Sequence, residues 1–256
     1  MIAFSTNASL ARVAREVAAD WRLELEAPFP AQYSYVAPVG ESAVLKVQSE
    51  GDDESLHEAE ALALWNGKGA VRILRHDVER RAMLLERALP GNDISDLSDE
   101  TATSIAVEVG NSLWQPADEP FRWIGDHVPR WLEEAALVPS PARDLIPLAR
   151  ELFESLDVSR STLVHGDLHH HNILDAGNSR YVAIDPKPMM GDPEFDVPPM
   201  LWNPIADEMT AAVTERRLTA FAAMGLDPWL MRAWSVIRGA YLRVDTTEVE
   251  VLRSLI

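Results

Sequence analysis

The 256-residue sequence contains no cysteine. This absence excludes disulfide bonds and thiolate metal ligands, and it is typical of a reducing compartment, so we expect a cytoplasmic protein. Long apolar runs are also missing, since no stretch approaches the roughly 18–20 uninterrupted apolar residues of a membrane-spanning helix. The N-terminal stretch lacks the basic segment and apolar core of a secretory signal. We therefore expect neither a membrane anchor nor secretion.

Basic residues are scarce relative to acidic ones, with 23 Lys and Arg against 41 Asp and Glu and a net charge of −18. Because binding to nucleic acid needs clustered basic residues, this balance argues against a nucleic-acid partner. The excess is uneven: the net charge is −4 up to Arg87 and −14 from Ala88 onward. An acidic second half suits a cationic small-molecule ligand. It is also typical of a solubilising surface, which is the interpretation that charge alone favours.

Apolar periodicity divides the chain into a β-rich first part and a mainly helical second part. The first part should begin with an amphipathic helix that starts near Asn7 or Ser9. Strands, a second helix and a hairpin with its turn near Asp77 are expected to follow. The second part should be helical over 103–113, 124–137 and 141–156, and again from about residue 204 onward. Three core positions are expected near the C-terminus: Trp229, Trp234 and Ile237.

The stretch HGDLHHHN holds four of the seven histidines, but its oxygen-bearing side chains carry more information. Asp167 and Asn172 lie five residues apart in a loop between two strand-like runs, and Asp185 ends the next apolar strand. Carboxylate and amide oxygens suit Mg²⁺, which is commonly held by one or two protein groups together with substrate phosphates. A carboxylate left over can orient or deprotonate a hydroxyl group.

The pattern H-G-D-x-x-x-x-N, followed by the triplet Ile-Asp-Pro, resembles the catalytic and metal-binding motifs of phosphoryl-transfer enzymes. The chain is most similar to the aminoglycoside phosphotransferases, and within them to the aminoglycoside/hydroxyurea antibiotic resistance kinases. The resemblance implies an α+β, two-lobed protein-kinase-like fold, with a nucleotide-binding lobe over 1–87 and a catalytic, substrate-binding lobe over 88–256. It also implies ATP and Mg²⁺ as cofactors, with Asp167 as the catalytic residue and Asn172 and Asp185 as metal ligands.

The resemblance assigns nucleotide-binding residues in the first part as well. Lys46, on an apolar strand, would contact the α- and β-phosphates, and a helix carboxylate would hold it. Glu58 fits the family spacing, whereas Glu60 lies two positions on and should point elsewhere on a helix. The backbone N–H and C=O groups from Glu86 to Ala88 would hydrogen-bond adenine.

The sequence departs from many nucleotide-binding proteins in its phosphate loop. It has neither G-x-G-x-x-G nor a Walker A motif, and the stretch from Pro28 to Gly40 contains one glycine. The family resemblance points instead to a serine-bearing loop, with Ser34 as the phosphate contact.

A zinc site built from His165, His169, His170 and His171 is disfavoured, because adjacent residues cannot all face one point and H-E-x-x-H is absent. We expect His165 to be buried and to hydrogen-bond the loop backbone. Asp192 and Asp196 remain open between substrate contact and bracing of loop amides, with bracing favoured for Asp196.

Acidic and aromatic residues in the second part could bind a cationic substrate, although a core position is favoured for each single tryptophan. They are Trp114, Trp123, Asp126, Trp131, Glu133, Glu134, Trp202 and Asn203. We predict phosphorylation of a hydroxyl on an aminoglycoside such as streptomycin. The alternatives are a kinase of an amino alcohol, a sugar or hydroxyurea on the same fold, and a non-catalytic nucleotide-binding module. The sequence gives no prediction of the oligomeric state.

Overall fold

The computed structural model describes residues 2–31, 33–51, 55–204 and 209–256. The chain forms two compact units, the first comprising Met1–Asn92 with Leu174–Lys187, and the second Asp93–Ile173 with Pro188–Ile256. Residues 88–92 and 174–187 thus group with the N-terminal unit, whereas the sequence division placed them in the second lobe. Two backbone hydrogen bonds explain part of this grouping, from Gly91 N–H to Asp175 C=O and from Asp175 N–H to Asn92 C=O, both 2.9 Å.

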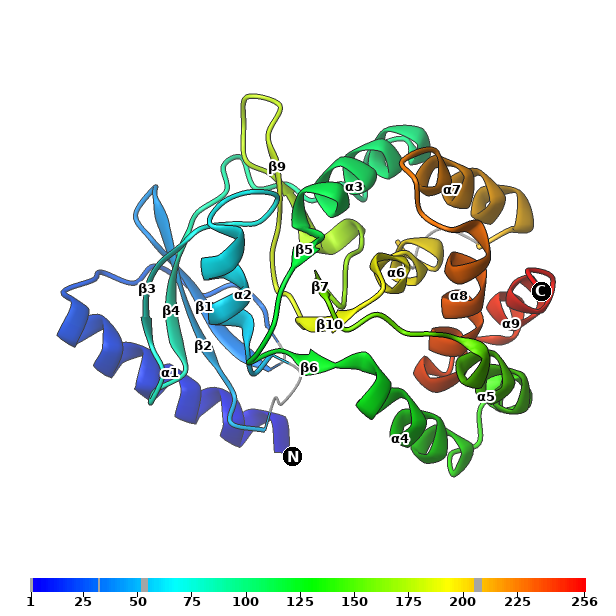
Figure 1. The fold of residues 1–256 in the computed structure, drawn as a ribbon. Helices are drawn as coiled ribbons and strands as arrows, with labels where there is room; N and C mark the ends of the chain where they lie inside the picture. The colour runs from blue at the N-terminus through cyan, green and yellow to red at the C-terminus, as the bar shows by residue number, and fades with distance from the viewer. Residues whose placement is uncertain (1, 32, 52–54, 205–208) are drawn as a thin grey trace. The chain divides into compact units, whose positions relative to one another are not determined.

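The first unit is built on a four-stranded antiparallel sheet in the order β1-β2-β4-β3 (Figure 1). Its strands are β1 (Ser34–Val39), β2 (Ala43–Gln48), β3 (Ile73–Asp77) and β4 (Ala82–Glu86). The last two form the predicted hairpin. Two helices, α1 (Ile2–Trp21) and α2 (Glu58–Trp65), accompany the sheet, and the short strands β8 (Ile173–Asp175) and β9 (Tyr181–Ala183) pair with each other. Helix α1 begins several residues before its predicted start.

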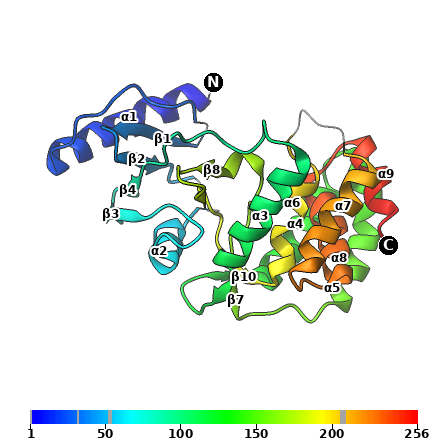
Figure 2. The same ribbon diagram turned by 90° about the horizontal axis from the view of Figure 1, so that it is seen from above.

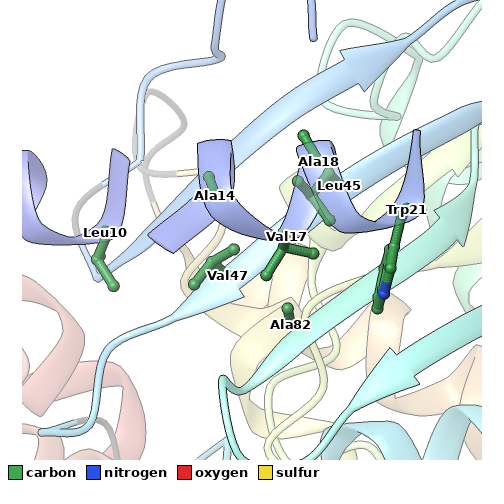
Figure 3. Packing of buried hydrophobic residues seen from close by; sticks show 8 residues of the cluster. All are labelled: Leu10, Ala14, Val17, Ala18, Trp21, Leu45, Val47 and Ala82. Carbon is green, nitrogen blue, oxygen red and sulfur yellow. The ribbon is translucent and has the colours of Figure 1, made fainter. Parts of the chain in front are cut away.

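Helix α1 packs on one face of the sheet, against β1 and β2. The spacing of the buried residues along α1 follows the helical period. Figure 3 shows the contact residues of the helix and of the strands: Leu10, Ala14, Val17, Ala18 and Trp21 from α1, with Leu45, Val47 and Ala82 from the sheet. Successive side chains of a strand point to opposite faces. Because Leu45 and Val47 face α1, the intervening Lys46 points to the other face of the sheet.

Truncating Leu45, which is fully buried, tests this packing. Leu45→Ala should lower the free energy of unfolding by about 2–5 kcal/mol, because the lost methyl groups leave a cavity under α1. The matched change Leu64→Ala, at a position with 43% exposure, should cost less than about 1 kcal/mol. Chemical denaturation monitored by circular dichroism measures both. Equal losses would contradict the placement of α1 on this face.

The second unit is mainly helical and gathers around α8 (Figure 2), which packs against α4, α5, α7 and α9. Its helices are α3 (Asp99–Leu113), α4 (Ile124–Ala136), α5 (Ile146–Ser155), α6 (Pro198–Leu201), α7 (Ala211–Ala223), α8 (Pro228–Leu242) and α9 (Thr246–Arg253). A small sheet has the order β5-β7-β10-β6, with β5 (Gln115–Pro116), β6 (Arg122–Trp123), β7 (Thr162–Val164) and β10 (Met189–Gly191). The predicted helical regions therefore match α3, α4 and α5 closely.

Helix α8 supplies the centre of this core. Trp234 and Ile237 are fully buried, as predicted, and the Trp234 ring packs edge-on against Phe195 with centroids 5.1 Å apart. The prediction for Trp229 is wrong, because this side chain is 47% exposed. It lies in the first turn of α8, beside the N-cap Asp227, rather than in the buried middle of the helix. Within the described ranges, no helix has the length and apolar character needed to cross a membrane.

Candidate active site

Lys46 lies at the centre of a charged group in the first unit. Its Nζ donates to both carboxylate oxygens of Glu58, at 2.8 and 2.6 Å, and to Oδ1 of Asp185 at 2.5 Å. Glu58 is the first residue of α2, and it, rather than Glu60, is the carboxylate that the structure places against Lys46. Lys46 and Glu58 are buried, whereas the Asp185 side chain is 54% exposed.

The three charges affect one another strongly. Burial opposes the charge on Lys46, but the neighbouring carboxylates of Glu58 and Asp185 outweigh it and raise the pKa of Lys46 above its usual value. Burial raises the pKa of Glu58 to about 7, although Lys46 acts in the opposite direction. Asp185 also adopts a left-handed backbone conformation, with φ of +56°, which is uncommon for a residue other than glycine. Such strain is typical of functional positions.

The residues predicted to bind the nucleotide lie in the same unit. Ser34 is the first residue of β1, and the carbonyl of Val36 in the same strand accepts a 2.8 Å hydrogen bond from Phe29 N–H. Glu86 ends β4, and its N–H already donates to the Arg72 carbonyl at 2.8 Å. The Glu86 N–H group therefore already has a partner within the fold, and Ala88 lies two residues beyond the strand.

The Glu86 side chain makes an ion pair that the sequence did not indicate. Arg180 donates to both of its carboxylate oxygens, at 2.7 and 3.1 Å, and Arg72 N–H donates at 3.1 Å. The Arg180 guanidinium is the largest cause that holds the pKa of Glu86 below its usual value. This pair ties the end of β4 to the segment between β8 and β9.

Asp167 lies in the loop that follows β7 in the second unit. Its side chain is 24% exposed, and its backbone carbonyl accepts a 2.9 Å hydrogen bond from the Asn172 amide. The same amide nitrogen lies 3.1 Å from Nε2 of His169, whose ring is 3.8 Å from the Asp167 carboxylate. The Asn172 side chain therefore stabilises the backbone of this loop through a hydrogen bond to the Asp167 carbonyl. The Asp167 carboxylate itself is partly exposed.

Two buried residues from other segments hold this loop. Asp196 is fully buried and accepts hydrogen bonds from His165 N–H at 2.8 Å and Gly166 N–H at 2.7 Å. Arg238, on α8, donates to the Gly166 carbonyl at 2.9 Å, and its guanidinium lies 4.1 Å from the centroid of the Phe195 ring. The favoured bracing role of Asp196 is confirmed. Arg238 was not identified from the sequence, because its local pattern is that of any arginine on an amphipathic helix.

The four histidines of the motif have separate roles. His165 is buried, and its Nδ1 accepts a hydrogen bond from Asp167 N–H at 3.3 Å, as expected. His171 Nδ1 lies 2.8 Å from Asp93, while His169 contacts Asn172. Burial lowers the pKa of His170 to about 3, so this ring is neutral. His165, His169 and His171 thus have different partners rather than a common centre.

Asp192 also braces the second unit. Its carboxylate accepts hydrogen bonds from Ser159 N–H at 2.9 Å and from the Trp234 indole at 3.1 Å. Of the tryptophans considered as substrate contacts, Trp114 donates to Asp196 at 3.0 Å and Trp123 donates to the Ser159 carbonyl at 3.1 Å. Both indoles therefore have partners within the fold.

Few side-chain oxygen atoms near the predicted metal ligands are available to coordinate a metal ion. Among the residues with defined positions, no group of three or more His, Asp or Glu side chains is arranged to hold a metal ion. Mg²⁺ does not need such a cage, since it usually keeps one or two protein ligands and takes its other oxygens from phosphates and water. The half-exposed Asp185 carboxylate of the first unit offers one such oxygen, and the side-chain amide of Asn172 offers another in the second unit.

An antiparallel sheet with a buried Lys–Glu pair, followed in the chain by a mainly helical unit, is the architecture of the protein-kinase-like phosphotransferases. Comparison with solved structures agrees. The choline kinase LicA from Streptococcus pneumoniae superimposes with a TM-score of 0.64 over 96% of this chain and 97% of that chain, at 14% identity. The predicted α+β, kinase-like fold is therefore confirmed.

Sequence comparison identifies the family. The model of the aminoglycoside/hydroxyurea antibiotic resistance kinases matches residues 22–248. The streptomycin 6-kinase of Streptomyces glaucescens is 32% identical over 246 residues, which cover 89% of this chain and 80% of the relative. The hydroxyurea phosphotransferase of Kitasatospora aureofaciens is 32% identical over 247 residues, covering 90% and 72%. The chain belongs to the aminoglycoside/hydroxyurea antibiotic resistance kinase family, and it is a phosphotransferase.

Proposed function

We propose that this protein transfers the γ-phosphoryl group of ATP, with Mg²⁺, to a hydroxyl of a cationic aminoglycoside such as streptomycin. The observation that carries the proposal is the geometry of the Asp167 loop. The Asp167 carboxylate is partly exposed, and the preceding residue, Gly166, is hydrogen-bonded through its backbone to the buried side chains of Asp196 and Arg238. A base held in place in this way is what proton transfer from a hydroxyl requires. The family assignment supports the same class of reaction.

Lys46 is the residue we assign to the α- and β-phosphates, with Glu58 holding it in place. Asn172 and Asp185 would hold Mg²⁺, which when bound neutralises the charge of the phosphate oxygens. Ser34 would add a phosphate contact, and the backbone from the Glu86 carbonyl to Ala88 would contact adenine. The raised pKa of Lys46 supports its role, because the side chain stays cationic.

Asp167 would orient the substrate hydroxyl and accept its proton. The hydroxyl oxygen then forms a bond to the γ-phosphorus, while the bond from that phosphorus to the β–γ bridging oxygen of ATP breaks and ADP leaves. The proton resides on the Asp167 carboxylate until it passes to solvent. Most of the rate enhancement in this chemistry comes from positioning and charge neutralisation.

The substrate assignment rests on charge and on relatives. The net charge of −14 from Ala88 onward favours a cationic acceptor, and one relative is a streptomycin 6-kinase. Hydroxyurea is the second candidate, because a relative of equal identity is a hydroxyurea phosphotransferase. Hydroxyurea is neutral and small, so it would gain nothing from the acidic charge.

A coupled assay of ADP release separates these candidates. Streptomycin, hydroxyurea, choline and a neutral sugar are each supplied with Mg·ATP. We expect kcat/KM for streptomycin to exceed that for hydroxyurea by about 100-fold or more, since lost charge and hydrogen-bond partners are costly in a polar site. A higher value with hydroxyurea or the neutral sugar would contradict the substrate assignment. ATP binding without ADP release on any acceptor would favour a binding module.

A further inference from the structure

Strand β2 brings a second polar side chain to the face that carries Lys46. Side chains two positions apart on a strand share a face, so Gln48 lies beside Lys46 and away from the α1 core. The Gln48 side chain is buried, with 7% of the residue exposed. A buried amide needs hydrogen-bond partners, and its partners here lie at the start of α2.

Gln48 donates from a single amide nitrogen to two acceptors. One is Oε2 of Glu58, at 2.7 Å, and the other is the backbone carbonyl of Ser55, at 3.2 Å. The Ser55 carbonyl also accepts from Glu58 N–H, at 3.1 Å. Gln48 is therefore bound both to the Glu58 carboxylate and to the backbone turn from which Glu58 projects.

The donors of Lys46 are fully used in this structure. An ammonium has three N–H donors, and those of Lys46 reach the two oxygens of Glu58 and one oxygen of Asp185. To contact a phosphate, Lys46 must withdraw at least one donor from a carboxylate. Glu58 is completely buried, so a lost donor leaves a costly unsatisfied charge unless another group replaces it.

We propose that Gln48 is a positioning residue for nucleotide binding. It keeps Glu58 hydrogen-bonded and oriented while Lys46 turns a donor toward the α- and β-phosphates. This inference rests on the proposed function, because it needs Lys46 to bind ATP. A purely structural Gln48 would instead contribute to folding and leave the affinity for nucleotide unchanged.

A double-mutant cycle on Mg·ATP affinity tests the inference, with the full-length protein and isothermal titration calorimetry. Gln48→Met removes the donor at similar volume and should weaken Mg·ATP binding about 10-fold, the scale of a hydrogen bond to a charged group. In steady-state assays KM for ATP should rise by the same factor while kcat changes little. In a Glu58→Gln background, where no carboxylate charge remains to be held, Gln48→Met should have an effect of less than about 2-fold.

The matched control is Gln115→Met, a change of the same type in β5 of the second unit, which should leave Mg·ATP affinity unchanged. If Gln48→Met does not fold, Gln48→Asn, whose shorter amide falls short of Glu58, takes its place with the same expectation. A lower melting temperature with unchanged affinity would overturn the inference, as would equal effects in both backgrounds. If the unmodified protein binds no Mg·ATP, the proposed function itself fails, and this inference with it.

Discussion

Replacing Asp167 with asparagine should lower kcat by about 10²–10⁴-fold, the range that a positioned general base contributes. Asparagine keeps the size of the side chain but cannot accept the proton of the substrate hydroxyl. The Asp167 backbone carbonyl, which accepts from Asn172, is unaffected by the change. We therefore expect the loop to keep its conformation and the affinity for Mg·ATP to stay within about 2-fold of the unmodified value. Single-turnover kinetics and calorimetry measure the two quantities separately.

The matched control for this prediction is Asp118→Asn, at an exposed position of the second unit. This variant should retain full turnover. If Asp167→Asn also retained near-normal turnover, Asp167 would not be the proton acceptor. A parallel loss of turnover and of nucleotide affinity would indicate a disturbed loop instead.

Replacing Asp196 with alanine should have the largest effect on stability. Its carboxylate accepts from His165 N–H, Gly166 N–H and the Trp114 indole. Each buried donor left without a partner costs roughly 1–3 kcal/mol, so the free energy of unfolding should fall by at least 3 kcal/mol on the same scale. Turnover should also fall, because the backbone before Asp167 loses its anchor. Urea denaturation gives the stability and the ADP-release assay gives the turnover.

Asp118→Ala is the control for this second prediction, with an expected change in stability of less than about 0.5 kcal/mol. A comparably small effect of Asp196→Ala would contradict the bracing role. Retained stability with lost turnover would instead assign Asp196 directly to the reaction.

Local patterns predicted much of this molecule. Asp167 and Asn172 lie close together in one loop, and Lys46 lies within an apolar strand. Both features depend only on residues that are neighbours in the chain. The helices α3, α4 and α5 follow the apolar period of 3.6 residues, so their positions were predictable as well. The exposed Trp229 shows the limit of this reasoning, because periodicity does not tell which turn of a helix is buried.

Contacts between distant segments were not predictable in this way. Arg238 reaches the Gly166 carbonyl across 72 residues, and Arg180 reaches Glu86 across 94. Nothing in the local sequence of either arginine distinguishes it from a surface residue. Gln48 differs from these two arginines, because residues two positions apart on a strand share a face of the sheet. Its position two residues after Lys46 therefore indicates that the two side chains lie on the same face. The grouping of residues 174–187 with the N-terminal unit likewise depends on backbone pairing that one sequence does not reveal.

The most direct test of the proposed reaction is product analysis by mass spectrometry after incubation with streptomycin and Mg·ATP. We expect streptomycin heavier by one phosphoryl group, formed in equal amount with ADP. Asp167→Asn should bind Mg·ATP and yield almost none of this product. Release of ADP with streptomycin unchanged, or the same yield of product from Asp167→Asn, would contradict the proposal that Asp167 directs phosphoryl transfer to this acceptor.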